Sequence, residues 1–171
     1  MKKLLILLVM PFIFNCNGTK KVTENARPLS ENLKPLSECW KNAVCTFEVM
    51  ENTTMTIDRD DANILYPKFE KKEGVKVIKY RAAENEDKMH VDGHYIEEIL
   101  FEVGNEVTEL NLTDADLASV KMLFGRHCFC KGAAGYFEVR KGSLVMKDGK
   151  LTIDIQNEQV PQRLEIVTGA F

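Results

Sequence analysis

The residues best suited to chemistry in this chain are His127, Cys128 and Cys130, which lie within the stretch FGRHCFCKG. An imidazole and two thiols at this spacing could bind a soft metal ion such as Cu(I), or zinc. The same thiols could exchange electrons as a redox pair, because the neighbouring basic residues favour the reactive thiolate. A third possibility is structural, with each thiol ending a cross-link to another part of the chain.

The other candidate groups favour simpler interpretations. His90 and His94 are four residues apart, but an Asp-Gly turn signal begins at Asp92 between them, so we expect a solvated loop. Glu97 and Glu98 are adjacent within a predicted strand and should point to opposite faces, which makes them poor acid and base partners for glycoside hydrolysis. The sequence contains no GxSxG, phosphate-binding glycine loop or HExxH motif. We therefore expect a protein that is not an enzyme and has no cofactor or dedicated metal site.

The amino terminus indicates export. The chain begins MKKLLILLVMPFIFNC, in which two lysines precede an apolar run over residues 4–14. Because this run is too short to cross about 30 Å of hydrocarbon, it is typical of a signal peptide. Cys16 follows the run directly, and the segment resembles the signal segment of bacterial lipoproteins. The resemblance implies that residues 1–15 are a signal peptide and that Cys16 carries the lipid anchor, palmitate included, as the first mature residue.

The resemblance also implies a location. Asn17 stands where an aspartate retains some lipoproteins in the inner membrane, which favours an anchor in the outer membrane and a domain facing the periplasm. Residues 16–37 then form the lipidated cysteine and a flexible tether, because this segment has two prolines, no aromatic residue and few apolar ones. Residues 38–171 are predicted to form a single β-rich globular domain.

The charge balance argues against a nucleic-acid partner. The chain has 23 basic and 26 acidic residues, and loss of the signal peptide removes two lysines, which changes the net charge from −3 to about −5. Binding to a phosphate backbone depends on clustered lysines and arginines, which a slightly acidic domain of this kind lacks. We therefore expect the membrane, through the anchor, and an envelope protein as the partners.

Export favours disulfides, because the periplasm is oxidising and four cysteines remain after the lipidated one. If residues 128–130 are extended, a rise of about 3.3 Å per residue separates the Cα atoms of Cys128 and Cys130 by about 6.6 Å, near the upper limit for a disulfide. A bond between these two cysteines would be strained and labile. We therefore expect crossed disulfides, in which they pair with Cys39 and Cys45. Such a link closes a loop of about 90 residues and would stabilise the sheet by about 4–5 kcal/mol.

Most of the domain is predicted to be β-strand. Segments of alternating apolar and polar residues indicate strands with one buried face, as in the stretch that contains Leu151 and Ile153. Asp148-Gly149 lies between two such segments and is the strongest hairpin signal in the chain. The predicted strands cover residues 45–50, 55–58, 75–81, 95–103, 107–112, 135–140, 144–146, 151–156 and 163–168. The fold class is therefore mainly β, an antiparallel meander of about eight or nine strands that forms a barrel or a sandwich.

One short helix is predicted at residues 114–124, directly before the cysteine motif. Thr113 is a suitable N-cap, and Gly125 can end the helix. Leu117 and Phe124 belong to an apolar stripe at spacings of three and four, which would face the core. The helix would end shortly before the HCFC stretch at residues 127–130.

The leading hypothesis from the sequence is a non-enzymatic cell-envelope lipoprotein that serves as a binding or accessory module for an envelope protein. A lipocalin-like carrier of a small apolar ligand is one alternative, and its warrant is the analogy of a β-barrel with a hollow interior. A copper or thiol-redox lipoprotein that uses His127, Cys128 and Cys130 is the other.

Overall fold

The computed structural model describes residues 33–84 and 94–171. The signal segment, Cys16 and most of the predicted tether lie outside these ranges, as does His90. The lipid anchor at Cys16 and the solvated loop between His90 and His94 therefore remain predictions.

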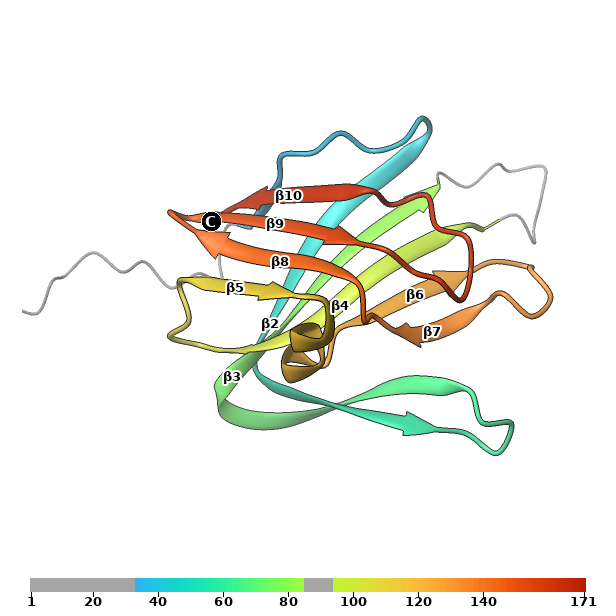
Figure 1. The fold of residues 1–171 in the computed structure, drawn as a ribbon, viewed down its shortest axis with the longest axis horizontal. Helices are drawn as coiled ribbons and strands as arrows, with labels where there is room; N and C mark the ends of the chain where they lie inside the picture. The colour runs from blue at the N-terminus through green and yellow to red at the C-terminus, as the bar shows by residue number, and fades with distance from the viewer. Residues whose placement is uncertain (1–32, 85–93) are drawn as a thin grey trace, which may run out of the picture.

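The described chain forms two antiparallel sheets of five strands each. The first sheet has the strand order β1-β10-β9-β8-β5 and the second has the order β2-β3-β4-β6-β7. Figure 1 shows the first sheet lying across the second, with the short helix η1 at one side. The elements are β1 (Lys34–Pro35), β2 (Ala43–Arg59), β3 (Leu65–Glu84), β4 (Ile96–Gly104), β5 (Leu110–Thr113), η1 (Asp114–Val120), β6 (Leu123–His127), β7 (Gly135–Glu138), β8 (Gly142–Lys147), β9 (Lys150–Ile155) and β10 (Ile166–Ala170). The predicted fold class, mainly β and antiparallel, is confirmed.

Strands β2 and β3 form a long hairpin that bends halfway along its length (Figure 1). The pairing register shifts between Glu51 and Thr53, and Gly74 on the partner strand has a φ of 82°, which glycine adopts without steric cost. Beyond the bend, Leu65 pairs with Tyr136 of β7, so β3, β4, β6 and β7 close into a small barrel. Gly74 therefore marks a bend within one hairpin.

A half-buried carboxylate, that of Glu102, holds the bent arm of this hairpin. Glu102 accepts hydrogen bonds from the Thr54 hydroxyl at 2.8 Å, from the Met55 N–H at 2.7 Å and from the Lys121 ammonium at 2.8 Å. Burial opposes ionisation of Glu102, but these donors outweigh it and keep the pKa of the carboxyl below its ordinary value. The ionised form of Glu102 is therefore part of the folded arrangement.

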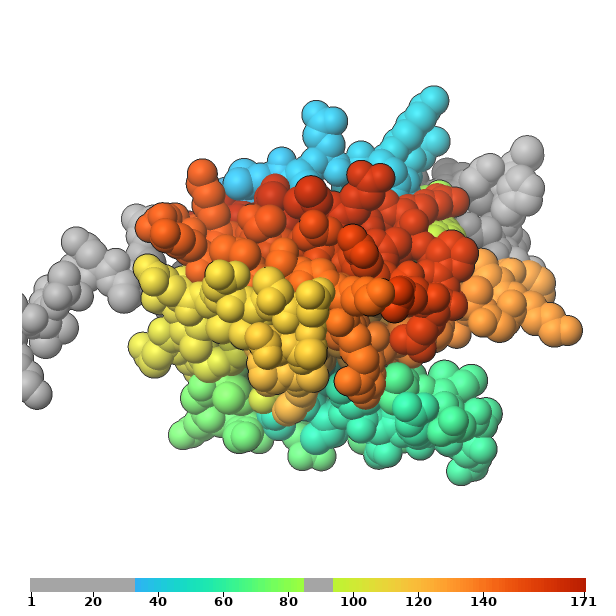
Figure 2. Space-filling view, viewed as in Figure 1, coloured from blue at the N-terminus to red at the C-terminus, as the bar shows by residue number. Residues whose placement is uncertain are grey.

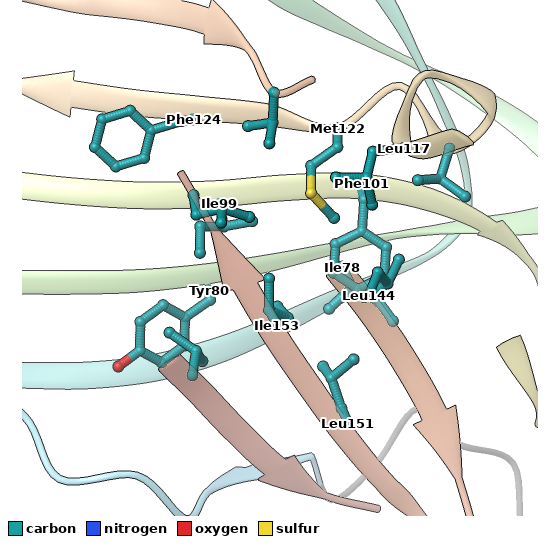
Figure 3. Packing of buried hydrophobic residues seen from close by; sticks show 14 of the residues in the cluster. Ile78, Tyr80, Ile99, Phe101, Leu117, Met122, Phe124, Leu144, Leu151 and Ile153 are labelled. Atoms are coloured by element: carbon teal, nitrogen blue, oxygen red, sulfur yellow. The ribbon is translucent and has the colours of Figure 1, made fainter. Parts of the chain in front are cut away.

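The main core fills the space between the two sheets. Figure 3 shows Tyr80, Ile99 and Phe101 of the second sheet together with Leu144 and Ile153 of the first, all almost fully buried. Each side chain of this size stabilises the fold by about 1.5–3 kcal/mol when it is fully buried. The region between the sheets is thus occupied by the protein's own side chains.

A second, smaller core lies on the other face of β3, β4 and β6. It consists of Met55, Val77, Leu100 and Leu123, which are completely buried. The bent arm supplies Met55 and so covers this face. The central strands are consequently buried on both faces, which explains why their sequences contain apolar runs as well as alternating segments.

The short helix predicted near residues 114–124 is confirmed, but it ends earlier than predicted and is of the 3₁₀ type. The structure has a 3₁₀ helix at Asp114–Val120, the Thr113 side chain makes no capping hydrogen bond, and Lys121 ends the helix with a φ of 54°. Phe124 belongs to strand β6, and its neighbour Leu123 is buried in the second core. The helical spacing was misleading because a strand that is buried on both faces also presents consecutive apolar residues.

Residues before the predicted boundary at residue 38 belong to the domain. Leu33 is buried in the main core, and Lys34 and Pro35 pair with β10. A proline is compatible with this position because β1 is an edge strand. The last residues of the predicted tether are therefore part of the first sheet.

Candidate functional site

The four cysteines of the domain form two short-range disulfides, so the predicted crossed pairing is wrong. Cys39 bonds to Cys45, with Cα atoms 5.9 Å apart. Cys128 bonds to Cys130, with Cα atoms 5.2 Å apart. Neither bond links the amino-terminal part of the domain to the strand after η1, and the sheets are therefore held together by packing and hydrogen bonds rather than by sulfur.

The order of the strands excludes the crossed pairing. Cys45 lies on β2, whereas Cys128 follows β6, and strands β3 and β4 lie between them. Three steps of about 4.8 Å between neighbouring strands separate the two positions by about 14 Å. A disulfide requires Cα atoms within about 7 Å of each other, so neither Cys128 nor Cys130 can bond to Cys45 on β2.

Local turns bring the partners together instead. At the first disulfide, the Ala43 N–H donates to the Trp40 carbonyl at 3.1 Å, and Asn42 has a φ of 66°, so the chain reverses between Cys39 and Cys45. This turn needs no long-range contact. It was not foreseen because the sequence signals for it are weak.

The second disulfide forms because residues 128–130 are not extended. Strand β6 ends at His127, and the chain bends at Cys128 and Phe129. The Ala133 N–H then donates to the Cys130 carbonyl at 3.1 Å, which closes a turn before β7. The assumption of an extended segment, which placed the Cα atoms about 6.6 Å apart, was therefore wrong.

The first disulfide borders a surface groove, which we name the Trp40 groove. The groove is lined by Ser37, Trp40, Cys45, Tyr80, Arg163 and Ile166, among others. Cys45 and Trp40 also pack against the main core, so the floor of the groove is continuous with the interior. The groove lies between the segment that follows β1 and the segment that leads into β10.

Aromatic rings and arginines are stacked at one end of the Trp40 groove. The Arg163 guanidinium lies 4.0 Å from the centre of the Tyr95 ring and 6.0 Å from that of Trp40. The Arg126 guanidinium lies 5.4 Å from the Tyr95 ring. Cation–π contacts of this kind fix the orientation of the guanidinium groups. The Trp40 Nε1 donor is buried and has no hydrogen-bond partner within the described ranges.

Glu97 stabilises the stack of Tyr95 and Arg163 through hydrogen bonds. It is fully buried, and its carboxylate accepts hydrogen bonds from the backbone N–H of Arg163 at 2.8 Å and of Leu164 at 2.7 Å. The Tyr95 hydroxyl donates to the same carboxylate at 2.5 Å. Burial, together with the bond to Glu97, raises the pKa of Tyr95. Glu97 thus positions the backbone segment that carries Arg163.

Glu98 lies on the opposite face of β4, as predicted, and belongs to a separate cluster. Its Oε2 accepts a hydrogen bond from the Tyr136 hydroxyl at 3.1 Å and lies 3.6 Å from Nε2 of His127. Arg81 Nε is 3.7 Å from the other carboxylate oxygen. A side chain at Gly125 would collide with Tyr136, because its Cβ would lie 2.7 Å from the ring. The glycine therefore allows the tyrosine to lie flat against β6.

The charges of this cluster favour an ionised carboxylate beside a neutral phenol. Burial opposes ionisation of Glu98, but the neighbouring His127 and Tyr136 outweigh it and lower the pKa of the carboxyl. Burial and the Glu98 charge raise the pKa of the Tyr136 hydroxyl. The cluster therefore anchors the end of β6, from which the chain continues into Cys128.

The loop between β6 and β7, residues 128–134, is named the Cys128 loop. Figure 2 shows this part of the chain projecting from one end of the molecule. Phe129, between the two sulfurs, is 93% exposed, which is the highest exposure among the large apolar side chains of the described residues. The disulfide thus lies in a protruding loop, outside both cores.

The metal site considered from the sequence would need free thiolates. Cys128 and Cys130 are bonded to each other, so their sulfurs are not available as thiolate ligands beside His127 in this state. Within residues 33–84 and 94–171, no group of three or more His, Cys, Asp or Glu side chains is arranged to hold a metal ion.

Sequence reasoning missed the grouping of Trp40, Tyr95, Glu97 and Arg163. The available signal was modest: Trp40 is the only tryptophan, and it stands beside a cysteine. The association with Arg163 depends on the pairing of distant strands and could not be read from spacing.

Two further observations bear on function. In the part of the chain that the structure describes, no helix has the length and apolar character needed to cross a membrane. Comparison of the chain with protein-family models, with curated proteins and with solved structures finds no match.

Proposed function

We propose that this chain is a cell-envelope lipoprotein, anchored through Cys16 in the outer membrane, with its β domain facing the periplasm as a non-enzymatic binding module for an envelope protein. The signal segment supports the anchor. The pairing of all four domain cysteines supports an oxidising compartment, where disulfides persist.

The observation that carries the binding role is the composition of the Trp40 groove. Tryptophan and arginine are enriched at the energetic centres of protein interfaces, and here Trp40 and Arg163 line the groove, while the buried Tyr95 ring supports the Arg163 guanidinium. Ile166, which lines the groove, is 56% exposed.

The occupant that fits is an extended segment of an envelope protein. Strand β1 pairs with the end of β10, where Pro35 lies opposite Gly169 and Lys34 opposite Ala170, and the Leu36 N–H extends this contact to the Thr168 carbonyl at 2.8 Å. Within residues 33–84 and 94–171, Ile166 and Val167 at the start of β10 pair with β9 and with no second strand. An extended segment could add to this free edge by main-chain hydrogen bonds while its side chains contact the groove.

Site-specific crosslinking tests the binding role. A photo-reactive residue is placed at Ile166, and Phe69 on the bent arm, which is also apolar and exposed, is the matched control position. We expect one envelope protein to crosslink from position 166 and not from position 69. The purified partner should then bind the Trp40→Ala variant at least tenfold more weakly than the wild type, a loss of about 1.4 kcal/mol. Identical crosslinks from both positions, or unchanged binding by the variant, would contradict the proposal.

The anchor is tested separately. Labelled palmitate should be incorporated into the wild-type protein and into a Cys128→Ser/Cys130→Ser variant, which keeps Cys16, but not into a Cys16→Ser variant. The Cys16→Ser protein should also leave the membrane fraction. Labelling that survives the loss of Cys16 would exclude this residue as the anchor.

The alternative of a carrier for a small apolar ligand gains no support from the described residues. Such a carrier needs a hollow interior, whereas the space between the sheets is filled by side chains such as Tyr80, Phe101 and Leu144 (Figure 3).

A further inference from the structure

We propose that the Cys128–Cys130 disulfide is an exchangeable redox site, which accepts two electrons from a dithiol of another envelope protein. This inference goes beyond the binding role of the Trp40 groove. It concerns the opposite face of β4 and a different loop, so either proposal can fail without the other.

The first argument is the size of the covalent ring. Cys128 and Cys130 are separated by two positions in the sequence, whereas Cys39 and Cys45 are separated by six. A ring that contains a single intervening residue leaves the backbone little freedom to relax around the bond. Constrained disulfides of this kind are more oxidising and are reduced more readily than unconstrained ones.

The second argument is access. Exchange requires a thiolate to approach one sulfur along the axis of the bond, so a disulfide inside a core reacts slowly. The tip of the Cys128 loop protrudes from the molecule (Figure 2): Phe129, between the two cysteines, is 93% exposed, and Cys128 and Cys130 are half-buried and belong to neither core. Cys45, in contrast, packs against the main core.

The third argument is that the fold can accommodate both redox states. Strands β6 and β7 remain paired without the disulfide, through the register that aligns Arg126 with Gly135 and Phe124 with Phe137. The Ala133 N–H bond to the Cys130 carbonyl closes the turn independently of the sulfurs. Opening the bond therefore releases the loop tip and leaves the hairpin in place.

The chemistry is a pair of thiol–disulfide exchanges. A thiolate of the partner dithiol attacks one sulfur of Cys128–Cys130, the bond between the two sulfurs breaks, and the other sulfur leaves as a thiolate that takes a proton from water. The second partner thiol then loses its proton and attacks the mixed disulfide, which releases the remaining cysteine. The partner dithiol is oxidised to a disulfide, and the Cys128–Cys130 disulfide is reduced to a dithiol by two electrons and two protons.

The test compares the two disulfides within the same folded protein. The mature wild-type protein is equilibrated with mixtures of reduced and oxidised dithiothreitol, quenched with acid and alkylated, and the redox state of each pair is measured by mass spectrometry. We expect Cys128–Cys130 to become half reduced at a dithiol-to-disulfide ratio at least tenfold lower than Cys39–Cys45, a difference of about 30 mV. Equal ratios, or earlier reduction of Cys39–Cys45, would overturn the proposal.

A peptide dithiol then tests electron transfer to a macromolecular partner. We expect the oxidised wild-type protein to convert one peptide dithiol to a disulfide per chain, and the Cys128→Ser/Cys130→Ser variant to convert none. A Cys39→Ser/Cys45→Ser variant should retain the transfer. Transfer that persists without Cys128 and Cys130 would refute the assignment. If the Cys39→Ser/Cys45→Ser variant does not fold, the comparison within the wild-type protein decides the question.

Discussion

The Trp40 groove and the Cys128 loop are built from similar parts and arranged differently. Each contains a short-range disulfide, and each rests on a glutamate from β4. Glu97, beneath the groove, binds two backbone N–H groups of the segment that leads into β10. The Glu98 carboxylate, beside the loop, contacts side chains instead, those of Tyr136, His127 and Arg81. One glutamate therefore fixes the course of the chain, and the other fixes only the end of a strand.

The Trp40 groove is held rigidly by its contacts, whereas the disulfide of the Cys128 loop is accessible to other molecules. At the groove, Glu97 holds the backbone at Arg163, and the Cys39–Cys45 disulfide packs against the main core through Cys45. These contacts hold the surface of the groove in one shape. At the loop, the anchoring contacts stop at His127 and the disulfide lies beyond them. A preorganised surface suits binding, because little ordering is needed when the partner arrives. A protruding disulfide suits exchange.

The largest effect should come from Glu97, and the matched change at Glu98 should have a much smaller one. Glu97→Gln replaces an acceptor oxygen by an amide donor that faces backbone N–H groups, so we expect the free energy of unfolding to fall by about 3 kcal/mol or more. Glu98→Gln should cost about 1 kcal/mol, because Tyr136 can still donate to the amide oxygen. Urea denaturation measures both values. Equal losses would remove the distinction between the two regions.

Loss of the disulfide at the groove should also lower the free energy of unfolding more than loss of the disulfide in the Cys128 loop. Loss of Cys39–Cys45 in the double serine variant should lower the free energy of unfolding by about 2 kcal/mol in the chain-entropy model, and more through the packing of Cys45. Loss of Cys128–Cys130 should cost less than about 1.5 kcal/mol, because the closed loop is smaller. A greater loss at the Cys128 loop would show that this bond is the structural one.

Acid should weaken the loop side through Glu98. Its pKa is lowered in the folded state, so the unfolded chain binds more protons in acid, and the stabilisation is present above the unfolded pKa of about 4.3. This contribution is lost as the pH falls through the folded pKa. Thermal unfolding measured across this range should therefore show a shallower decline for Glu98→Gln than for the wild type. The same decline in both proteins would contradict the assignment.

The smallest effect on stability is expected for Phe129→Ser. The side chain is almost wholly exposed, so the free energy of unfolding should change by less than about 0.5 kcal/mol. Exchange with a protein dithiol should slow several-fold, because an apolar contact beside the sulfurs is lost, whereas reduction by dithiothreitol should keep its rate. Parallel kinetics with the two reductants distinguish docking from intrinsic reactivity.

The sequence predicted the parts of the fold that depend on neighbouring residues. The Asp148-Gly149 turn has positive φ at both positions and joins β8 to β9 as expected, since only a few residue types adopt this geometry readily. Strand β6 was missed because Leu123 and Phe124 are buried on opposite faces and show no alternation. The long hairpin was split into separate strands because its bent middle, around Gly74, is rich in charged residues.

The sites were harder to predict than the fold. That Glu97 and Glu98 point to opposite faces follows from strand geometry alone. The disulfide pairing depends on how many strands separate β2 from β6, which residue spacing does not reveal. The crossed pairing was predicted because a disulfide that closes a longer loop removes more entropy from the unfolded chain. The distance across the sheet between these cysteines is too great for such a bond.

The most direct test is the disulfide connectivity of the purified, unreduced protein after tryptic digestion. We expect peptides 22–41 and 42–59 to be joined by Cys39–Cys45, and peptide 127–131 to carry an internal bond and lack two hydrogens relative to its reduced form. A peptide 127–131 bonded to either of the other two would contradict both the strand order and the contrast between the regions.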